Sequence, residues 1–228
     1  MKKIGMVVAI EREIRAVLQK FGEPKDEKMY GQISVRTYEK GDAVLYVAHS
    51  GIAEIAAAAA TQLLISLYNV ELLLNCGVVG GLTEEMGTAK TTVVKSVVHY
   101  DYDSSDIDPV VPGQYLELPS VYIPTDEALV EKAVTLFPEL RAVICASADK
   151  FVNSKEAKQE LHAKYGAEVC DMESAGIALT CHRNGVPTLM LKTVADAIEG
   201  GADGFEKACV ETANICMGIA EKLIEELA

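Results

Sequence analysis

Positive charge is scarce in this 228-residue sequence, which has 21 Lys and Arg against 34 Asp and Glu and a formal net charge of −13. Most of its surface would therefore repel a nucleic-acid backbone or an anionic membrane. Long hydrophobic runs are also absent, because the longest uncharged stretch, 55–70, contains polar residues and is too short to span a bilayer. We expect a small-molecule ligand, with no nucleic acid and no membrane as partner.

Metal-binding, redox and nucleophile motifs are missing as well. The four histidines lack the spacings of zinc sites, the six cysteines include no Cys-x-x-Cys pair, and there is no Gly-x-Ser-x-Gly elbow. The nearest metal candidate, His99 with Asp101 and Asp103, is more typical of a solvated acidic turn. The cysteines lie mostly in apolar stretches, as reduced core thiols do. From these spacings we expect no metal site. The apolar N-terminal run is too short for a signal peptide, so we expect a cytoplasmic protein.

What is present is an alternation of Val-, Ile- and Leu-rich runs with helical patterns. It predicts one α/β domain over 1–228, with a mixed, twisted central sheet covered by helices on both faces. The expected strands are 3–10, 32–38, 43–48, 71–76, 89–98, 141–147, 167–172 and 187–193. The expected helices are 11–21, 53–69, 125–136, 154–164, 173–184 and 205–227. The segment 99–120 shows neither period, and we expect a long excursion that serves as a lid, a binding loop or a subunit contact.

Polar or glycine-rich residues occupy four strand-to-helix junctions, which are the places where ligands bind in open α/β sheets. These junctions are 11–13, 50–52, 77–81 and 192–196. Taken alone, Glu13 suits the positive end of a helix dipole, and the Asp171 that precedes Glu173 suits a helix N-cap. The glycines permit a close backbone approach without matching a nucleotide-phosphate motif. Asp196 follows an apolar run, and its carboxylate needs solvent, a partner or a pocket.

Several segments follow one another in a distinctive order: IGMVVAIEREI, HSGIAEIAAAAA, LNCGVVGGL, HYDYD, SADKFV, CDMESAGIA and VADA. Over nearly the whole chain this order resembles the bacterial 5′-methylthioadenosine/S-adenosylhomocysteine nucleosidases, within the purine nucleoside phosphorylase and uridine phosphorylase superfamily. The resemblance implies a nucleoside phosphorylase-like fold and a homodimer without a cofactor. It also implies hydrolysis of the N-glycosidic bond of an adenine nucleoside, 5′-methylthioadenosine and/or S-adenosylhomocysteine.

The resemblance further implies roles for individual residues. Glu13 falls on the catalytic carboxylate that activates the attacking water, and Asp196 on the acid that protonates N7 of the departing adenine. Glu173 falls on the residue that binds the ribose hydroxyls. The other substrate-binding residues expected around base, sugar and 5′ group are Ile52, Val78, Val79, Gly80, Phe151, Val152, Met172, Lys192 and Phe205.

Three carboxylates suit this chemistry. An N-glycosidic bond breaks through an oxocarbenium-like sugar, and adenine leaves easily only when protonated, which a carboxylic acid kept neutral near pH 7 can achieve. A second carboxylate can orient water on the opposite face of the sugar, as in inverting glycosidases. A third can grip two hydroxyls and stabilise the positive charge that develops on the sugar.

The chain departs from the family pattern at three positions. Val78 stands where the family usually has Ser or Thr, and Lys192 and Ala195 stand where it commonly has Arg and Ser. A phosphorylase on the same fold is one alternative, but no cationic phosphate loop is evident and Glu13 would repel the anion. A non-catalytic nucleoside-binding protein is another, which Val78 and Lys192 favour and the three retained carboxylates oppose.

Overall fold

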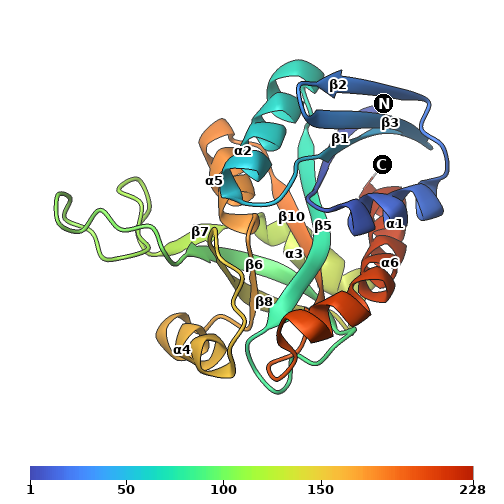
Figure 1. Ribbon diagram of the computed structural model, residues 1–228. Coiled ribbons are helices and arrows are strands. Elements are labelled where there is room, and N and C mark those ends of the chain that lie inside the picture. The colour runs from blue at the N-terminus through green and yellow to red at the C-terminus, as the bar shows by residue number, and fades with distance from the viewer. Residues whose placement is uncertain (228) are drawn as a thin grey trace.

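Ten strands form one mixed sheet in the computed structural model, which describes residues 1–227 (Figure 1). Strand β5 is its centre, because it pairs in parallel with β1 and β10 and its last residues also pair with β9. The pairing continues from β10 through β6 and β8 back to β9, so these strands close on themselves. The strands are β1 (Lys2–Val8), β2 (Asp26–Tyr30), β3 (Ile33–Lys40), β4 (Ala43–His49), β5 (Leu72–Gly81), β6 (Thr91–His99), β7 (Tyr122–Pro124), β8 (Arg141–Ser147), β9 (Val169–Asp171) and β10 (Thr188–Asp196).

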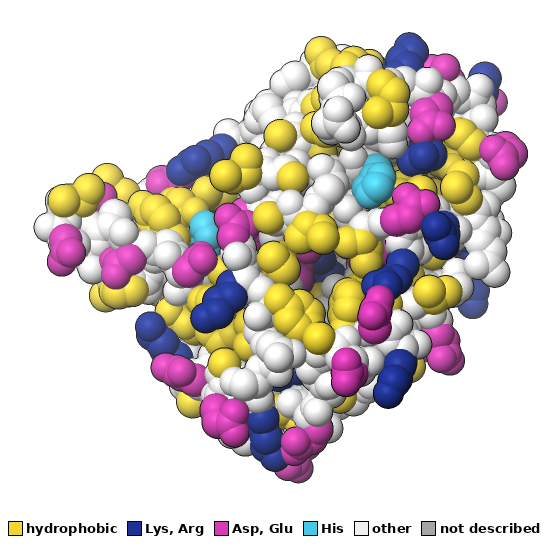
Figure 2. All heavy atoms as spheres, viewed as in Figure 1, with side chains coloured by type: hydrophobic (Ala, Val, Ile, Leu, Met, Phe, Trp, Pro, Cys, Tyr) yellow, Lys and Arg dark blue, Asp and Glu magenta, His cyan; other side chains and the backbone are white. Residues whose placement is uncertain are grey.

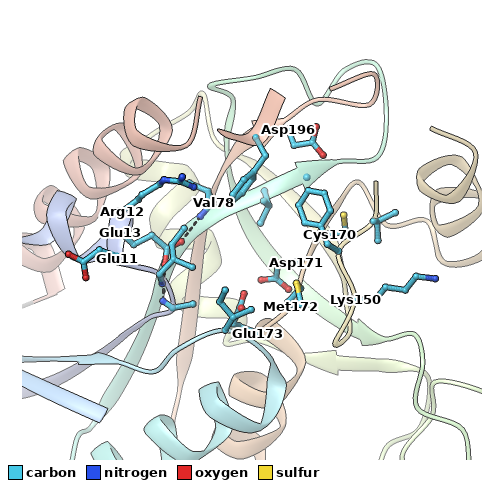
Figure 3. Close-up of a pocket in the computed structure, with 18 of the residues that line it drawn as sticks. Glu11, Arg12, Glu13, Val78, Lys150, Cys170, Asp171, Met172, Glu173 and Asp196 are labelled. Atoms are coloured by element: carbon cyan, nitrogen blue, oxygen red, sulfur yellow. Dashed lines mark hydrogen bonds between the residues drawn. The ribbon is translucent and has the colours of Figure 1, made fainter. Parts of the chain in front are cut away.

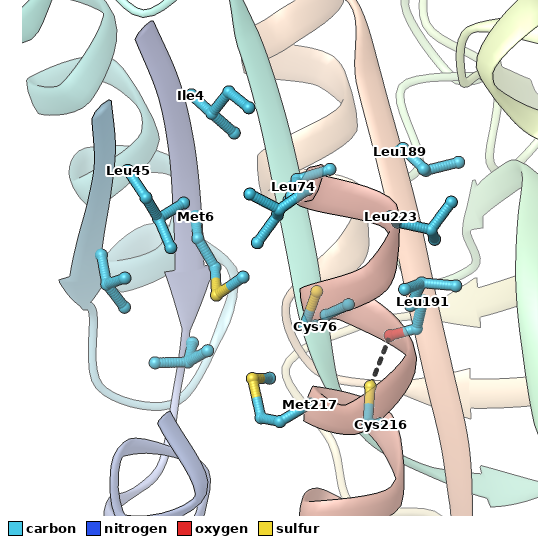
Figure 4. Close-up of a cluster of buried hydrophobic side chains, with 14 of the residues drawn as sticks. Ile4, Met6, Leu45, Leu74, Cys76, Leu189, Leu191, Cys216, Met217 and Leu223 are labelled. Carbon is cyan, nitrogen blue, oxygen red and sulfur yellow. Dashed lines mark hydrogen bonds between the residues drawn. The ribbon is translucent and has the colours of Figure 1, made fainter. Parts of the chain in front are cut away.

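Helices cover both faces of the sheet. Helices α1, α3 and α6 pack with one hydrophobic cluster, and α2 and α5 pack with a second cluster on the other face. Figure 4 shows α6 beside β5 and β10, with Met217 and Leu223 among the core side chains. Burial from both faces explains why the central strands are almost entirely apolar. The helices are α1 (Glu11–Phe21), α2 (Glu54–Leu63) with a π-helical extension (Leu64–Tyr68), α3 (Glu127–Leu136), α4 (Lys155–Tyr165), α5 (Ser174–Asn184) and α6 (Gly201–Leu227).

The segment between β6 and β7 projects from the body of the protein, at the left of Figure 1. Stacked aromatic rings connect its outgoing and returning parts, since the ring centroids of Tyr102 and Tyr115 are 4.1 Å apart. The Tyr115 hydroxyl also lies 2.7 Å from His99 Nδ1, and Asp101 Oδ1 lies 3.0 Å from His99 Nε2. His99 is thus engaged within the excursion that the sequence predicted.

The α/β class and the mixed sheet covered on both faces are confirmed, with three local differences. Strand β2 was not predicted because it is a charged, mostly exposed edge strand that pairs only with β3. Strand β7 was missed because it has only three residues. Residues 77–81 continue β5 instead of forming a turn, since β10 and β9 supply pairing partners there.

All six cysteines are free and buried, as expected of core thiols. Within residues 1–227, no helix has both the length and the apolar character that a membrane crossing requires.

Candidate active site

A cavity of about 530 Å³ opens where β1, β5, β9 and β10 end. Figure 2 shows hydrophobic side chains, with scattered charged ones, around a hollow near the middle of this face. Every predicted site residue except Lys192 lines the cavity. Five further residues also line it and were not selected from the sequence, although all but Arg15 stand within the recognised motifs: Ala9, Ile10, Arg15, Lys150 and Cys170. The volume is within the range typical of small-molecule sites.

Glu13 is buried in the first turn of α1, and its carboxylate turns back toward the sheet (Figure 3). One oxygen accepts hydrogen bonds from the backbone N–H groups of Ala9, at 2.8 Å, and Ile10, at 3.2 Å. The other accepts from the N–H of Val78 at 3.0 Å. Burial raises the pKa of Glu13, and these donors oppose that rise. Glu13 is therefore a buried side chain that backbone hydrogen bonds fix inside the cavity. It is not a solvent-exposed charge that only interacts with the helix dipole.

Two glycines of β5 allow close approach by neighbours, Gly77 by the Glu13 carboxylate and Gly81 by the backbone of Met86. A Cβ atom at Gly77 would lie 2.4 Å from Glu13 Oε1, and one at Gly81 would lie 2.2 Å from the backbone oxygen of Met86. Real Cβ atoms do not tolerate such contacts. The close approach expected from the glycine pattern is thus present, although the backbone there is a strand.

Glu173 is the N-cap residue of α5, and its Oε1 accepts a hydrogen bond from the N–H of Ala53 at 3.1 Å. Ala53 adopts φ 87°, ψ 160°, a conformation rare outside glycine that costs on the order of 1–3 kcal/mol. Burial and the nearby Asp171 charge raise the pKa of Glu173 to about 7. The strained loop therefore holds a carboxylate that changes charge near neutral pH.

Lys192 lies behind the cavity wall, which corrects its expected role as a residue that contacts the substrate. Its ammonium is almost fully buried and lies 2.6 Å from Asp171 Oδ2. Burial opposes charge on both groups, yet their attraction lowers the pKa of Asp171 and raises that of Lys192. The lysine acts as the counter-ion of Asp171, and Asp171 itself faces the cavity.

A second buried carboxyl group is connected to Asp171 through a serine. Ser147 Oγ lies 2.6 Å from Asp171 Oδ1 and 2.5 Å from Glu54 Oε1. A hydroxyl has one proton, so it can donate to only one of two carboxylates. Because Asp171 is ionised beside Lys192, we infer that Glu54 is protonated and donates to Ser147. Burial, followed by the Asp171 charge, raises the pKa of Glu54 to about 8, in agreement with this assignment.

Asp196 ends β10, and its side chain is 1% exposed. Its Oδ2 lies 2.6 Å from the ammonium of Lys158, a residue of α4 that sequence reasoning did not identify. The ring of Phe151 packs edge-on against Phe205, with centroids 5.8 Å apart, and both residues line the cavity with Asp196. Flat apolar rings beside a carboxyl group suit a heteroaromatic base with polar nitrogen atoms.

The charges of the site favour a neutral ligand over an anion. In the described part of the chain, the buried ammonium groups of Lys158 and Lys192 are each paired with a carboxylate. Arg12 and Arg15 line the cavity, but they pair with Glu206 and Glu11, which leaves the exposed Lys150 as the lining cation without an ion pair among the described residues. Residues 1–227 also contain no cluster of three His, Cys, Asp or Glu side chains suited to a metal ion.

The family is settled by comparison with known proteins. The family model described as "Phosphorylase superfamily" matches residues 3–228. The chain belongs to the phosphorylase superfamily. The fold and the family inferred from the motif order are thereby confirmed.

Similar members of the phosphorylase superfamily are nucleosidases. The aminodeoxyfutalosine nucleosidase of Helicobacter pylori (strain J99) is 28% identical over the full length of both chains. The 5′-methylthioadenosine/S-adenosylhomocysteine nucleosidase of Shewanella denitrificans is 30% identical over 85% of this chain and 86% of its own. The crystal structure of the 5′-methylthioadenosine/S-adenosylhomocysteine nucleosidase from Helicobacter pylori, with butyl-thio-DADMe-Immucillin-A, superposes with a TM-score of 0.93. The two chains are 27% identical, and the match covers 99% of each.

Proposed function

We propose that this superfamily member hydrolyses the N-glycosidic bond of an adenine nucleoside, 5′-methylthioadenosine and/or S-adenosylhomocysteine, releasing adenine and the 5′-thioribose. The observation that carries the proposal is the set of three buried carboxyl groups, of Glu13, Glu173 and Asp196, around one largely apolar cavity. The nucleosidases to which the chain is similar support the same reaction.

Glu13 is the group that orients and deprotonates the attacking water. Its two oxygens accept three backbone hydrogen bonds, which fix the carboxylate and leave one of its roughly four lone-pair sites available. Burial raises its pKa, and a more basic carboxylate is a better proton acceptor. The hydroxyl usual at position 78 is missing, but Val78 contributes its backbone N–H to Glu13.

Glu173 grips the ribose hydroxyls, with Met172 beside it in the cavity wall. A carboxylate that accepts from two hydroxyls fixes the sugar and stabilises the positive charge that develops on the ring. At this end of the cavity Asp171 is ionised, and the Lys192 ammonium behind it compensates its charge.

Asp196 protonates the base, while Phe151 and Val152 contact its flat face and its edge. These residues share the cavity with Asp196 but come from the segment before α4. Ile10 and Ile52, which precede the segments that contain Glu13 and Ala53, provide an apolar lining that suits a 5′ alkylthio group. Because a Helicobacter pylori relative is an aminodeoxyfutalosine nucleosidase, that nucleoside belongs in the substrate panel.

The proposal includes a homodimer in the cytoplasm. Three apolar residues of the projecting segment, Ile107, Val111 and Leu116, are 86%, 55% and 61% exposed. Exposed apolar side chains on a projecting segment are typical of a protein contact surface. Light scattering after size exclusion should give twice the monomer mass, and a monomer mass at micromolar concentration would contradict this part of the proposal.

Substrate profiling of the purified protein tests the reaction. Release of the free base, which is hypoxanthine for inosine and adenine for the others, should be measured with 5′-methylthioadenosine, S-adenosylhomocysteine, aminodeoxyfutalosine, adenosine and inosine, each with and without phosphate. Release from the first two without phosphate supports the nucleosidase. Strict dependence on phosphate would indicate a phosphorylase, and binding without any release would indicate a non-catalytic nucleoside-binding protein.

A further inference from the structure

A buried lysine contacts the carboxylate that we assign as the acid. Lys158 is 0% exposed, and its ammonium donates to Asp196 Oδ2 at 2.6 Å and to the carbonyl oxygen of Ala197 at 2.8 Å. Lysine is almost never fully buried unless it is paired. Removing two charges from water is costly, so a buried ion pair is weak evidence for stability and points to a role of Lys158 in the chemistry of Asp196.

The two carboxylate oxygens of Asp196 differ in their hydrogen bonding. Oδ2 is held by Lys158, whereas Oδ1 has no hydrogen-bond partner among the described residues. Glycines allow the backbone to approach Oδ1 closely, because a Cβ atom at Gly200 would lie 2.4 Å from it and one at Gly204 would lie 3.6 Å away. One oxygen is anchored by the ammonium, and the backbone N–H of Gly201 is a nearby main-chain donor that also favours the charged form of Asp196 and lowers its pKa.

The same region that anchors the acid also contacts the base. Phe151 and Val152 line the cavity immediately before α4, and Lys158 follows within the first two turns of that helix. Asn153 Oδ1 accepts a hydrogen bond from the N–H of Ala202, which ties the segment after Asp196 to the same region. A shift of α4 would therefore move base contacts and acid together.

We propose that Lys158 is the positioning residue of the acid, fixing the Asp196 carboxyl group against α4 and setting the pH range over which it carries a proton. This proposal rests on the proposed function, in which Asp196 protonates adenine. Burial raises the pKa of Asp196, and the Lys158 ammonium opposes that rise by stabilising the carboxylate. The lysine thus prevents the acid from becoming too weak to donate.

Few other titratable groups face this pair. Cys170 of β9 lies beside them, and burial raises its pKa to about 12, so it stays neutral at working pH. Strand β5, the segment before α6 and the first turn of α6 face Asp196 with Gly80, Gly200 and Gly204, respectively. Lys158 is therefore the cation whose removal should change the titration of Asp196.

The test compares Lys158→Met, which removes the charge, with Lys158→Arg, which keeps it, and with Lys164→Met, a control at an exposed position of the same helix. An opposite charge at this distance lowers an aspartate pKa by about 1–3 units. The Lys158→Met variant should therefore show the alkaline limb of kcat displaced upward by about 1–3 pH units. Its kcat at pH 7 should fall by about ten- to a hundredfold, the size of effect seen when a reacting group is misplaced.

The control and rescue variants separate positioning from folding. Lys164→Met should keep the wild-type rate and profile, and Lys158→Arg should bring the limb back toward the wild type. In an Asp196→Asn background, Lys158→Met should add no further loss, because it acts through Asp196. If Lys158→Met alone does not fold, Lys158→Arg and the double variant, which has neither buried charge, still give the comparison. The proposal would be overturned if Lys158→Met had the wild-type pH profile. It would also be overturned if adding Lys158→Met to Asp196→Asn caused the same loss of rate that Lys158→Met causes alone.

Calorimetric titration with free adenine distinguishes this proposal from the proposed function. A protonated Asp196 donates to the base, so adenine affinity should fall as pH rises through the pKa of Asp196. That transition should move upward in Lys158→Met. A wild-type protein that cleaves no nucleoside would refute the proposed function alone, whereas an unmoved transition in an enzyme that cleaves normally would refute only the role of Lys158.

Discussion

Replacing Glu54 by Gln tests whether the buried carboxyl group below the ribose end is protonated. The Glu54 side chain accepts from the N–H of Gly176 through Oε2 and contacts the Ser147 hydroxyl through Oε1. A glutamine amide can make the same two contacts, with its NH₂ group donating to Ser147 and its oxygen accepting from Gly176. The variant therefore copies the protonated acid and removes only the ability to ionise.

The expected magnitude follows from the pKa of Glu54, which burial and the Asp171 charge raise from 4.5 to about 8. Below pH 4.5 the group is protonated in both the folded and the unfolded chain. Between pH 4.5 and 8 only the unfolded chain ionises, so the folded state loses stability as pH rises. At 1.36 kcal/mol per unit, the full loss above pH 8 is about 5 kcal/mol. The glutamine variant lacks this loss.

Urea unfolding at pH 5, 7 and 9 measures the difference. The free energies of unfolding of wild type and Glu54→Gln should be similar at pH 5, and the variant should be more stable by several kcal/mol at pH 9. Glu131→Gln, at an exposed position of α3, should show no such divergence. A difference between wild type and Glu54→Gln that does not change from pH 5 to 9 would refute the protonated assignment.

Three further substitutions test the roles of the cavity residues. Asp196→Asn should leave nucleoside binding largely intact and reduce cleavage by about two to four orders of magnitude, the range for a positioned acid; normal turnover would mean that another group protonates the base. Glu173→Gln should weaken nucleosides far more than free adenine, and it should remove a rise in kcat/KM near pH 7, where the carboxylate that accepts from the hydroxyls forms; equal losses for both ligands would contradict this role. Val78→Ser introduces the hydroxyl usual in the family, and initial rates of adenine release should be faster. An unchanged rate would contradict a role for the missing hydroxyl and would mean that the backbone N–H at position 78 already suffices to hold Glu13.

Much of the fold could be predicted because its central strands are buried on both faces and are therefore almost continuously apolar. The edge strand β2 escaped prediction for the opposite reason, since its residues are exposed and charged. The extension of β5 through Gly81 was also missed. Glycines normally indicate turns, and only the pairing of β5 with β10 and β9 reveals that they are needed here for close approach.

The candidate site was predicted less completely. Glu13, Glu173 and Asp196 could be selected because each is a carboxylate beside an apolar strand in a recognisable order. Their partners could not be selected in this way. Lys158 and Glu54 are charged residues on helices, where solvated faces are usual, and their burial follows from how α4 and α2 pack. Lys192 was recognised as unusual, but a sequence pattern cannot show that its ammonium turns to Asp171 and away from the ligand.

The most direct test of the central claim is the fate of water oxygen during cleavage of 5′-methylthioadenosine in ¹⁸O-labelled water without phosphate. If Glu13 directs water to the sugar, the released 5′-methylthioribose should carry one ¹⁸O atom at C1, and Glu13→Gln should slow its appearance by about two to four orders of magnitude. Because the free sugar exchanges this oxygen, the product must be trapped by reduction at early times. Formation of the sugar 1-phosphate when phosphate is added, with no release in its absence, would contradict the account.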